Sequence, residues 1–131
     1  MKTLIVEDDF TSRLLLQEFL KSYGPTHVAV NGREAVDAVR AALEAGERYS
    51  LICLDIMMPL VDGHEALRQI RSLEDAQGIL STHGAKIIMT TALGNVSNIS
   101  KAYSALCDAY LVKPIDRKQL LQELSNLGLI K

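Results

Sequence analysis

The sequence has little of what marks several classes of protein. It has no tryptophan and two phenylalanines among 131 residues, so it lacks the aromatic platform on which single-stranded nucleic acids stack. Its 14 Lys and Arg do not outnumber its 16 Asp and Glu, which indicates no nucleic-acid partner. No apolar run approaches the ~20 residues that span a bilayer, and the first residues lack a secretory signal. We therefore expect one cytoplasmic domain with no nucleic-acid or membrane partner.

Cysteine is equally scarce. Cys53 and Cys107 have no CxxC spacing and no accompanying His pattern, which excludes a structural zinc site and a disulfide scaffold. Both lie among apolar residues, and we expect two buried thiols.

Five short apolar runs recur along the chain, and each precedes a stretch with helical periodicity. Several runs are nearly continuous rather than alternating, as in strands covered on both faces. Strands that alternate with helices predict an α/β fold with a parallel sheet and right-handed crossovers. The predicted strands are residues 3–6, 27–30, 51–54, 86–89 and 109–112.

Helix start signals accompany three of the periodic stretches. Asn31, Asp62 and Asp116 each precede an acid or amide by three residues, which resembles the capping box. The stretch 95–106 begins with GNVSNIS, which is rich in poor helix formers, and predicts a marginal helix. Residues 75–85 are expected to form a surface loop. The first helix should begin near Phe10, and its apolar positions are Leu14, Leu15, Phe19 and Leu20.

Polar side chains follow the predicted strands. Acids follow the first strand, Asp55 the third, Thr91 the fourth and Lys113 the fifth. Because the carboxyl ends of parallel strands share one edge, we expect these side chains to meet there. Carboxylates without imidazole or thiolate neighbours favour Mg²⁺ or Mn²⁺. With a lysine and a hydroxyl beside them, such groups suit phosphoryl transfer to the Asp55 carboxylate.

The same residues stand in the segments LIVEDD, LDIMMPLVDG, IIMTTA and LVKPI, each at its place in the strand–helix order. In these segments the sequence resembles the receiver domain of two-component response regulators, most of all a single-domain chemotaxis-type regulator. The resemblance covers residues 2–127. It implies a flavodoxin-like (βα)5 fold, with a doubly wound five-stranded parallel sheet in the order 2-1-3-4-5 and helices on both faces. It also implies one receiver domain over residues 1–131.

The resemblance assigns a role to each acid. Asp55 matches the phosphoacceptor. Asp9 matches a direct Mg²⁺ ligand and Asp8 an acid acting largely through water, while the backbone carbonyl of Met57 matches the third protein ligand. Glu7 is expected to be a neighbour rather than a ligand. Mn²⁺ is the other ion that this set would take.

The remaining matches concern the switch. Thr91 matches the switch hydroxyl, Lys113 the lysine that pairs with the phosphoryl group, and Tyr110 the aromatic switch residue. The Lys113–Pro114 bond resembles the family's cis peptide. Apolar Met57 and Leu93 depart from the most studied pattern, and they predict slow loss of the phosphoryl group.

The implied function is a phosphoryl-accepting switch rather than a turnover enzyme, although it would catalyse its own phosphorylation and dephosphorylation. A histidine kinase or phosphotransfer protein would supply the phosphoryl group to Asp55. The face of the fourth helix, fifth strand and fifth helix would then bind a downstream protein, or form a dimer as in many relatives. Both a free-standing regulator and a receiver excised from a longer protein fit the sequence.

Three other functions stay open. A Mg²⁺-dependent phosphatase with an aspartyl nucleophile would carry an acid two residues after Asp55, where Met57 stands. A flavodoxin-type ligand carrier would need a phosphate-binding loop where EDD stands, and three acids repel phosphate. A non-phosphorylated interaction module would not need the complete set of acids, Thr91 and Lys113.

Overall fold

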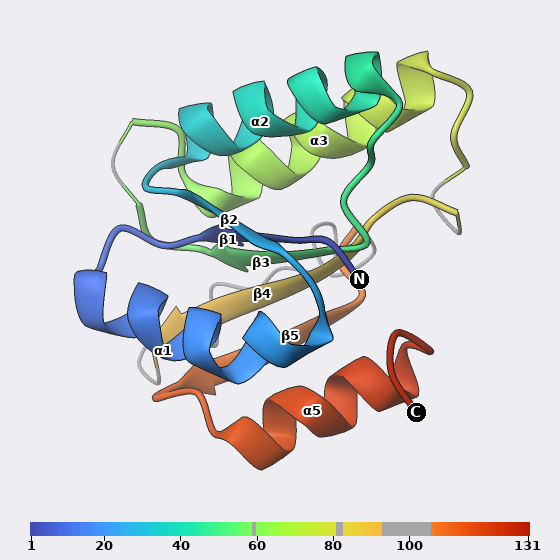
Figure 1. Ribbon diagram of the computed structural model, residues 1–131. Coiled ribbons are helices and arrows are strands. Elements are labelled where there is room, and N and C mark those ends of the chain that lie inside the picture. The colour runs from blue at the N-terminus through green and yellow to red at the C-terminus, as the bar shows by residue number, and fades with distance from the viewer. Residues whose placement is uncertain (59, 81–82, 93–105) are drawn as a thin grey trace.

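The computed structural model describes residues 1–58, 60–80, 83–92 and 106–131. Five parallel strands form one sheet in the order β2-β1-β3-β4-β5. Helices α2 and α3 cover one face, and α1 and α5 cover the other (Figure 1). The predicted fold and strand order are confirmed. The elements are β1 (Thr3–Val6), α1 (Phe10–Leu20), the 3-10 turn η1 (Lys21–Tyr23), β2 (Thr26–Ala29), α2 (Gly32–Ala45), β3 (Leu51–Asp55), α3 (Gly63–Ala76), β4 (Lys86–Ala92), β5 (Ala109–Lys113) and α5 (Arg117–Asn126).

Two apolar layers hold these elements together. Side chains of β1 alternate between them: Leu4 and Val6 pack toward α2 and α3, while Ile5 packs toward α1 and α5. Every residue of β1 and β3 is buried, which explains why residues 4–6 and 51–54 are apolar without alternation. Burial of each such aliphatic side chain contributes about 1.5–3 kcal/mol.

The predicted helix caps are confirmed. The side chains of Asn31, Asp62 and Asp116 each accept a hydrogen bond from the backbone N–H three residues later, at 2.8, 2.9 and 3.1 Å. Each bond satisfies an N–H that the first helical turn leaves unpaired. Local sequence therefore sets where α2, α3 and α5 begin.

Helix α1 departs from expectation. Leu16 and Leu20 face the core, while Leu14 and Leu15 are 48% and 39% exposed. The buried stripe follows an i, i+4 spacing, so two consecutive leucines cannot both belong to it. Helix α1 therefore presents apolar side chains to solvent.

Several boundaries also differ from the predictions. Strand β4 runs through Ala92, so Thr91 lies within it rather than after it, and Lys113 is the last residue of β5. The parallel ladder continues between these strands through the pair Ala92 and Lys113, which extends both. Helix α3 continues to Ala76, into the predicted loop. The helix predicted over 95–106 lies, except for Leu106, outside the described residues.

The two cysteines differ in burial. Cys53 is buried as expected, whereas Cys107 is partly exposed. Among the described helices, none has the length and apolar character that a membrane crossing requires.

Candidate functional site

Three carboxylates meet at the carboxyl edge of the sheet. Glu7 follows β1, and its N–H continues the strand ladder by donating to the carbonyl of Ala29 at 3.0 Å. Asp55 ends β3 and is 5% exposed, while Asp8 is exposed. Carboxylate oxygens of Glu7, Asp8 and Asp55 all lie within 4.8 Å of one another. We call these three residues the acidic cluster.

Asp9 lies outside the acidic cluster, contrary to its predicted place. Its carboxylate accepts a hydrogen bond from the backbone N–H of Ser12 at 2.9 Å and caps α1. This hydrogen bond lowers the pKa of Asp9. Its backbone N–H donates to the carboxylate of Glu7 at 3.2 Å. The acids that lie close to Asp55 are therefore Glu7 and Asp8, whereas the sequence assigned Asp8 and Asp9 as the pair. An Asp directly before a helix is an N-cap signal, which would have identified this role.

Lys113 reaches the acidic cluster from the end of β5. Its Nζ lies 2.5 Å from Glu7 Oε1 and 3.2 Å from Asp55 Oδ2. Burial raises the pKa of Glu7, and the Asp55 carboxylate adds to this, while Lys113 opposes it. Burial would lower the pKa of Lys113, but the two carboxylates outweigh it and the pKa is raised. The ammonium therefore stays charged against the two buried acids.

The acidic cluster fits a divalent cation. Glu7 Oε1 is buried and faces the ammonium of Lys113. With all three acids ionised, Lys113 cancels one negative charge and leaves two. An oxygen-only donor set with this residual charge suits a hard cation such as Mg²⁺.

The loop after β3 holds Asp55 in place. The backbone N–H of Met57 donates to Asp55 Oδ1 at 3.2 Å. A Cβ on Gly63 would lie 2.3 Å from the backbone oxygen of Asp55, so glycine is the residue that permits this approach. The Met57 side chain is 59% exposed at the edge of the acidic cluster.

The predicted switch residues lie on β4 and β5. Thr91 is fully buried, and its hydroxyl donates to the carbonyl of Ala92 at 3.3 Å. Thr91 pairs in register with Val112, next to Lys113. Tyr110 is 48% exposed on β5, which is the edge strand. The Lys113–Pro114 peptide is cis, as expected.

Comparison with known proteins identifies the family. The model of the response regulator receiver domain matches residues 3–125. The transcriptional regulatory protein ResD of Bacillus subtilis (strain 168) is 35% identical over 127 residues, which are 96% of this chain and 47% of ResD. Probable histidine kinase 2 of Oryza sativa subsp. indica is 31% identical over 132 residues, covering 93% of this chain and 12% of the kinase. The chain thus spans about half the length, or less, of these curated relatives.

Solved structures agree in fold. The receiver domain of sensor histidine kinase PA1611 from Pseudomonas aeruginosa PAO1 has a TM-score of 0.76 and 26% identity, covers 97% of each chain, and carries a magnesium ion in its active-site cleft. The receiver domain of the histidine kinase CKI1 from Arabidopsis thaliana, complexed with Mg²⁺ and BeF₃⁻, has a TM-score of 0.76 and 26% identity, covering 97% of this chain and 89% of that one. The strand order, the acidic cluster beside a lysine and these matches lead to one conclusion: this chain belongs to the response regulator receiver domain family, the phosphoacceptor modules of two-component signalling systems.

Proposed function

We propose that Asp55 accepts a phosphoryl group and that the chain, as one receiver domain over residues 1–131, is a cytoplasmic signalling switch. One observation carries this proposal: a carboxylate that is 5% exposed lies 3.2 Å from the ammonium of Lys113 and beside two further acids. A buried carboxylate with a fixed cation is positioned to act as a nucleophile toward an anionic phosphoryl donor.

In the proposed reaction, an Asp55 carboxylate oxygen attacks the phosphorus of a phosphohistidine. The oxygen–phosphorus bond forms and the phosphorus–nitrogen bond breaks. The bonding electron pair stays on the imidazole nitrogen, which takes a proton from solvent. Lys113 Nζ, already 3.2 Å from Asp55 Oδ2, neutralises charge on the transferred group.

Glu7, Asp8 and Asp55 would hold Mg²⁺, or Mn²⁺ in its place, together with the backbone carbonyl of Met57. The bound ion would supply charge neutralisation between the carboxylates and the phosphoryl oxygens. Glu7 replaces Asp9 in this set because its carboxylate lies in the acidic cluster while that of Asp9 caps α1.

The donor is proposed to be a histidine kinase or a phosphotransfer protein. Exposed apolar side chains indicate a protein partner, because they lie in the same chain segments as the acids of the site. Phe10, Met57 and Leu60 are 63%, 59% and 79% exposed. Exposed apolar groups beside a polar site mark interaction surfaces.

The residues around Asp55 favour a long-lived phosphoryl group on Asp55 over repeated phosphate hydrolysis. Met57 occupies the position two residues after Asp55, where an aspartyl phosphatase would carry a general acid. Its apolar side chain has no group to position or deprotonate a water molecule. The chain therefore promotes its own phosphorylation and slow dephosphorylation without acting as a turnover phosphatase.

Phosphorylation would add about 1.5 to 2 negative charges at Asp55. We propose that the Thr91 hydroxyl turns toward this charge and that Tyr110, on the edge strand, moves into the space it leaves. The face of β5, α5 and the segment preceding β5 would then bind a downstream protein. Coupling of this kind is typically ~1–3 kcal/mol.

The test is incubation of the purified chain with Mg²⁺ and acetyl phosphate, followed by intact mass measurement. We expect one acid-stable, base-labile phosphoryl group on the wild type and none on Asp55→Asn. Equal modification of both proteins, or of neither, would overturn the assignment of Asp55.

A further inference from the structure

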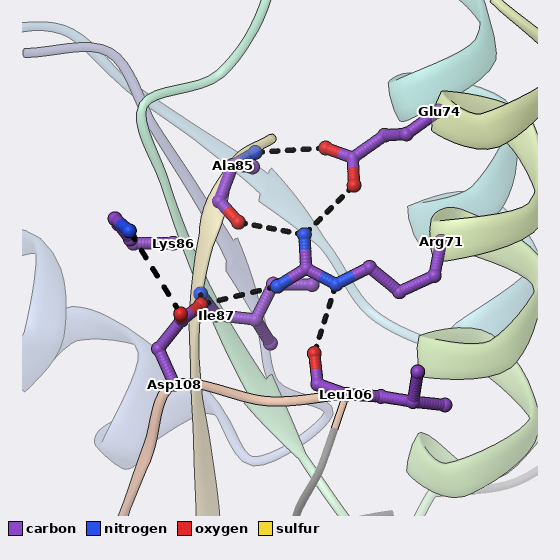
Figure 2. Close-up of polar contacts among 7 residues, drawn as sticks. All are labelled: Arg71, Glu74, Ala85, Lys86, Ile87, Leu106 and Asp108. Carbon is purple, nitrogen blue, oxygen red and sulfur yellow. Dashed lines mark hydrogen bonds and ion pairs between the residues drawn. The ribbon is translucent and has the colours of Figure 1, made fainter. Parts of the chain in front are cut away.

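A second polar cluster lies at the amino ends of β4 and β5. It consists of Arg71 and Glu74 on α3 and Asp108, which directly precedes β5; we call it the anchor cluster (Figure 2). The side chains of Arg71, Glu74 and Asp108 are 9%, 4% and 21% exposed. Neither phosphoryl transfer nor the acidic cluster uses these residues.

Arg71 joins α3 to two other segments. Its Nε donates to the carbonyl of Leu106 at 2.8 Å, and its Nη1 donates to the carbonyl of Ala85 at 2.8 Å. Nη1 also donates to Glu74 at 2.7 Å, and Nη2 donates to Asp108 at 3.1 Å. The planar guanidinium suits these diverging acceptors, whereas a lysine ammonium on a flexible stem would not reach all of them.

The two acids hold the start of β4 directly. Glu74 Oε2 accepts the N–H of Ala85 at 2.7 Å, while Arg71 donates to the Ala85 carbonyl. Arg71 and Glu74 together therefore bind both polar groups of the Ala85 backbone. Asp108 Oδ2 accepts the N–H of Ile87 at 2.8 Å, and the Asp108 N–H donates to the Ile87 carbonyl at 2.8 Å. The beginnings of β4 and β5 are therefore tied to each other and to α3.

The carboxyl ends of the same two strands hold Thr91 and Lys113, near the acidic cluster. We propose that Arg71 anchors the amino ends of β4 and β5 to α3, so that a change of charge at Asp55 displaces only the carboxyl halves of these strands. Arg71 is thus a positioning residue. Without the charge of Arg71, the buried carboxylate of Glu74 would have no cation beside it. Helix α3 would then no longer hold the beginnings of β4 and β5 in one well-defined position.

Hydrogen exchange tests the anchor itself. Arg71→Gln should lower the protection of the Ala85 and Ile87 amides by about 10- to 100-fold, because their acceptors Glu74 and Asp108 would lose the cation that holds them in place. Arg68→Gln is the matched control, because Arg68 lies on the same helix and pairs with Glu65 at the exposed surface. Equal protection in both variants would overturn the anchor.

A second measurement tests how far a perturbation spreads. Backbone amide chemical shifts are compared with and without Asp55→Asn, which changes the charge without phosphorylation. In the wild type and in Arg68→Gln, we expect shifts at Thr91 and Lys113 that stop before Leu106–Asp108. In Arg71→Gln they should extend into that segment.

The proposal would be overturned if the shift changes caused by Asp55→Asn covered the same residues in the wild type, Arg68→Gln and Arg71→Gln. It would also be overturned if these changes already reached Asp108 in the wild type. A purely structural role predicts lower stability without any change in spread. If Arg71→Gln does not fold, Asp108→Asn replaces it, because an amide still accepts the Ile87 N–H while removing the charge that faces Arg71. The comparison does not need phosphorylation, so it stands or falls separately from the proposed function.

Discussion

Glu7 and Asp9 should respond in opposite ways when Mg²⁺ binding is measured. Glu7→Gln removes one negative charge from the acidic cluster with little change in side-chain size. A carboxylate and a divalent cation 4.8 Å apart, the outer spacing of the cluster oxygens, attract each other by about 7 kcal/mol at an effective dielectric constant of ~20. Water and salt reduce this at a partly open site. We therefore expect Mg²⁺ affinity to fall by about 10- to 100-fold, or about 1.4 to 2.8 kcal/mol.

The assay is calorimetric titration of Mg²⁺ into the purified chain at neutral pH. Asp9→Asn is the matched control, because asparagine caps a helix as well as aspartate does. Its Mg²⁺ affinity should equal that of the wild type, while Asp55→Asn should weaken binding as Glu7→Gln does. Weak binding by Asp9→Asn together with normal binding by Glu7→Gln would refute the reasoning and restore the ligand pair assigned from the sequence.

Four further outcomes follow from the structure. The raised pKa of Glu7 means that this group stabilises the fold fully below pH 4.5 and ceases to do so as pH rises through the raised value. Without Mg²⁺, Glu7→Gln should therefore raise the melting temperature most near neutral pH and least near pH 4.5; a constant gain would contradict this. Gly63→Ala places a Cβ 2.3 Å from the Asp55 backbone oxygen, and denaturant unfolding should show a loss of about 1–3 kcal/mol. Cys53 is 1% exposed and burial raises its pKa to about 12, so peptide mapping after iodoacetamide should find it modified only when the chain is unfolded. Met57→Asn should speed loss of the phosphoryl group from Asp55, because an amide can position water and a thioether cannot; an unchanged decay rate would exclude this role.

Residue order alone was informative about local structure. Asn31, Asp62 and Asp116 begin helices as predicted, because capping involves residues three apart in the chain. The apolar runs located all five strands to within a few residues, since burial on both faces requires continuous apolar sequence. Both signals depend on neighbours in sequence, which a pattern can reveal.

The same reasoning could not resolve two local roles that compete for adjacent acids. Asp8 and Asp9 were assigned together, yet Asp9 caps α1 while Glu7 joins the acidic cluster. Thr91 was placed after its strand because the pairing of β4 with β5 depends on a distant segment. Arg71 gave no signal at all, because its acceptors become neighbours only once α3 packs against the sheet.

The sequence by itself determined the order of the five strands and of the helices that the described residues contain, and therefore the edge at which chemistry would collect. Only the tertiary structure decided which acid faces which cation. Lys113 meets Glu7 and Asp55 because β5, β1 and β3 end at one edge of the sheet. The physical reason is that capping and periodicity act within a few residues, whereas ion pairing depends on distances in space that strand order and helix packing establish.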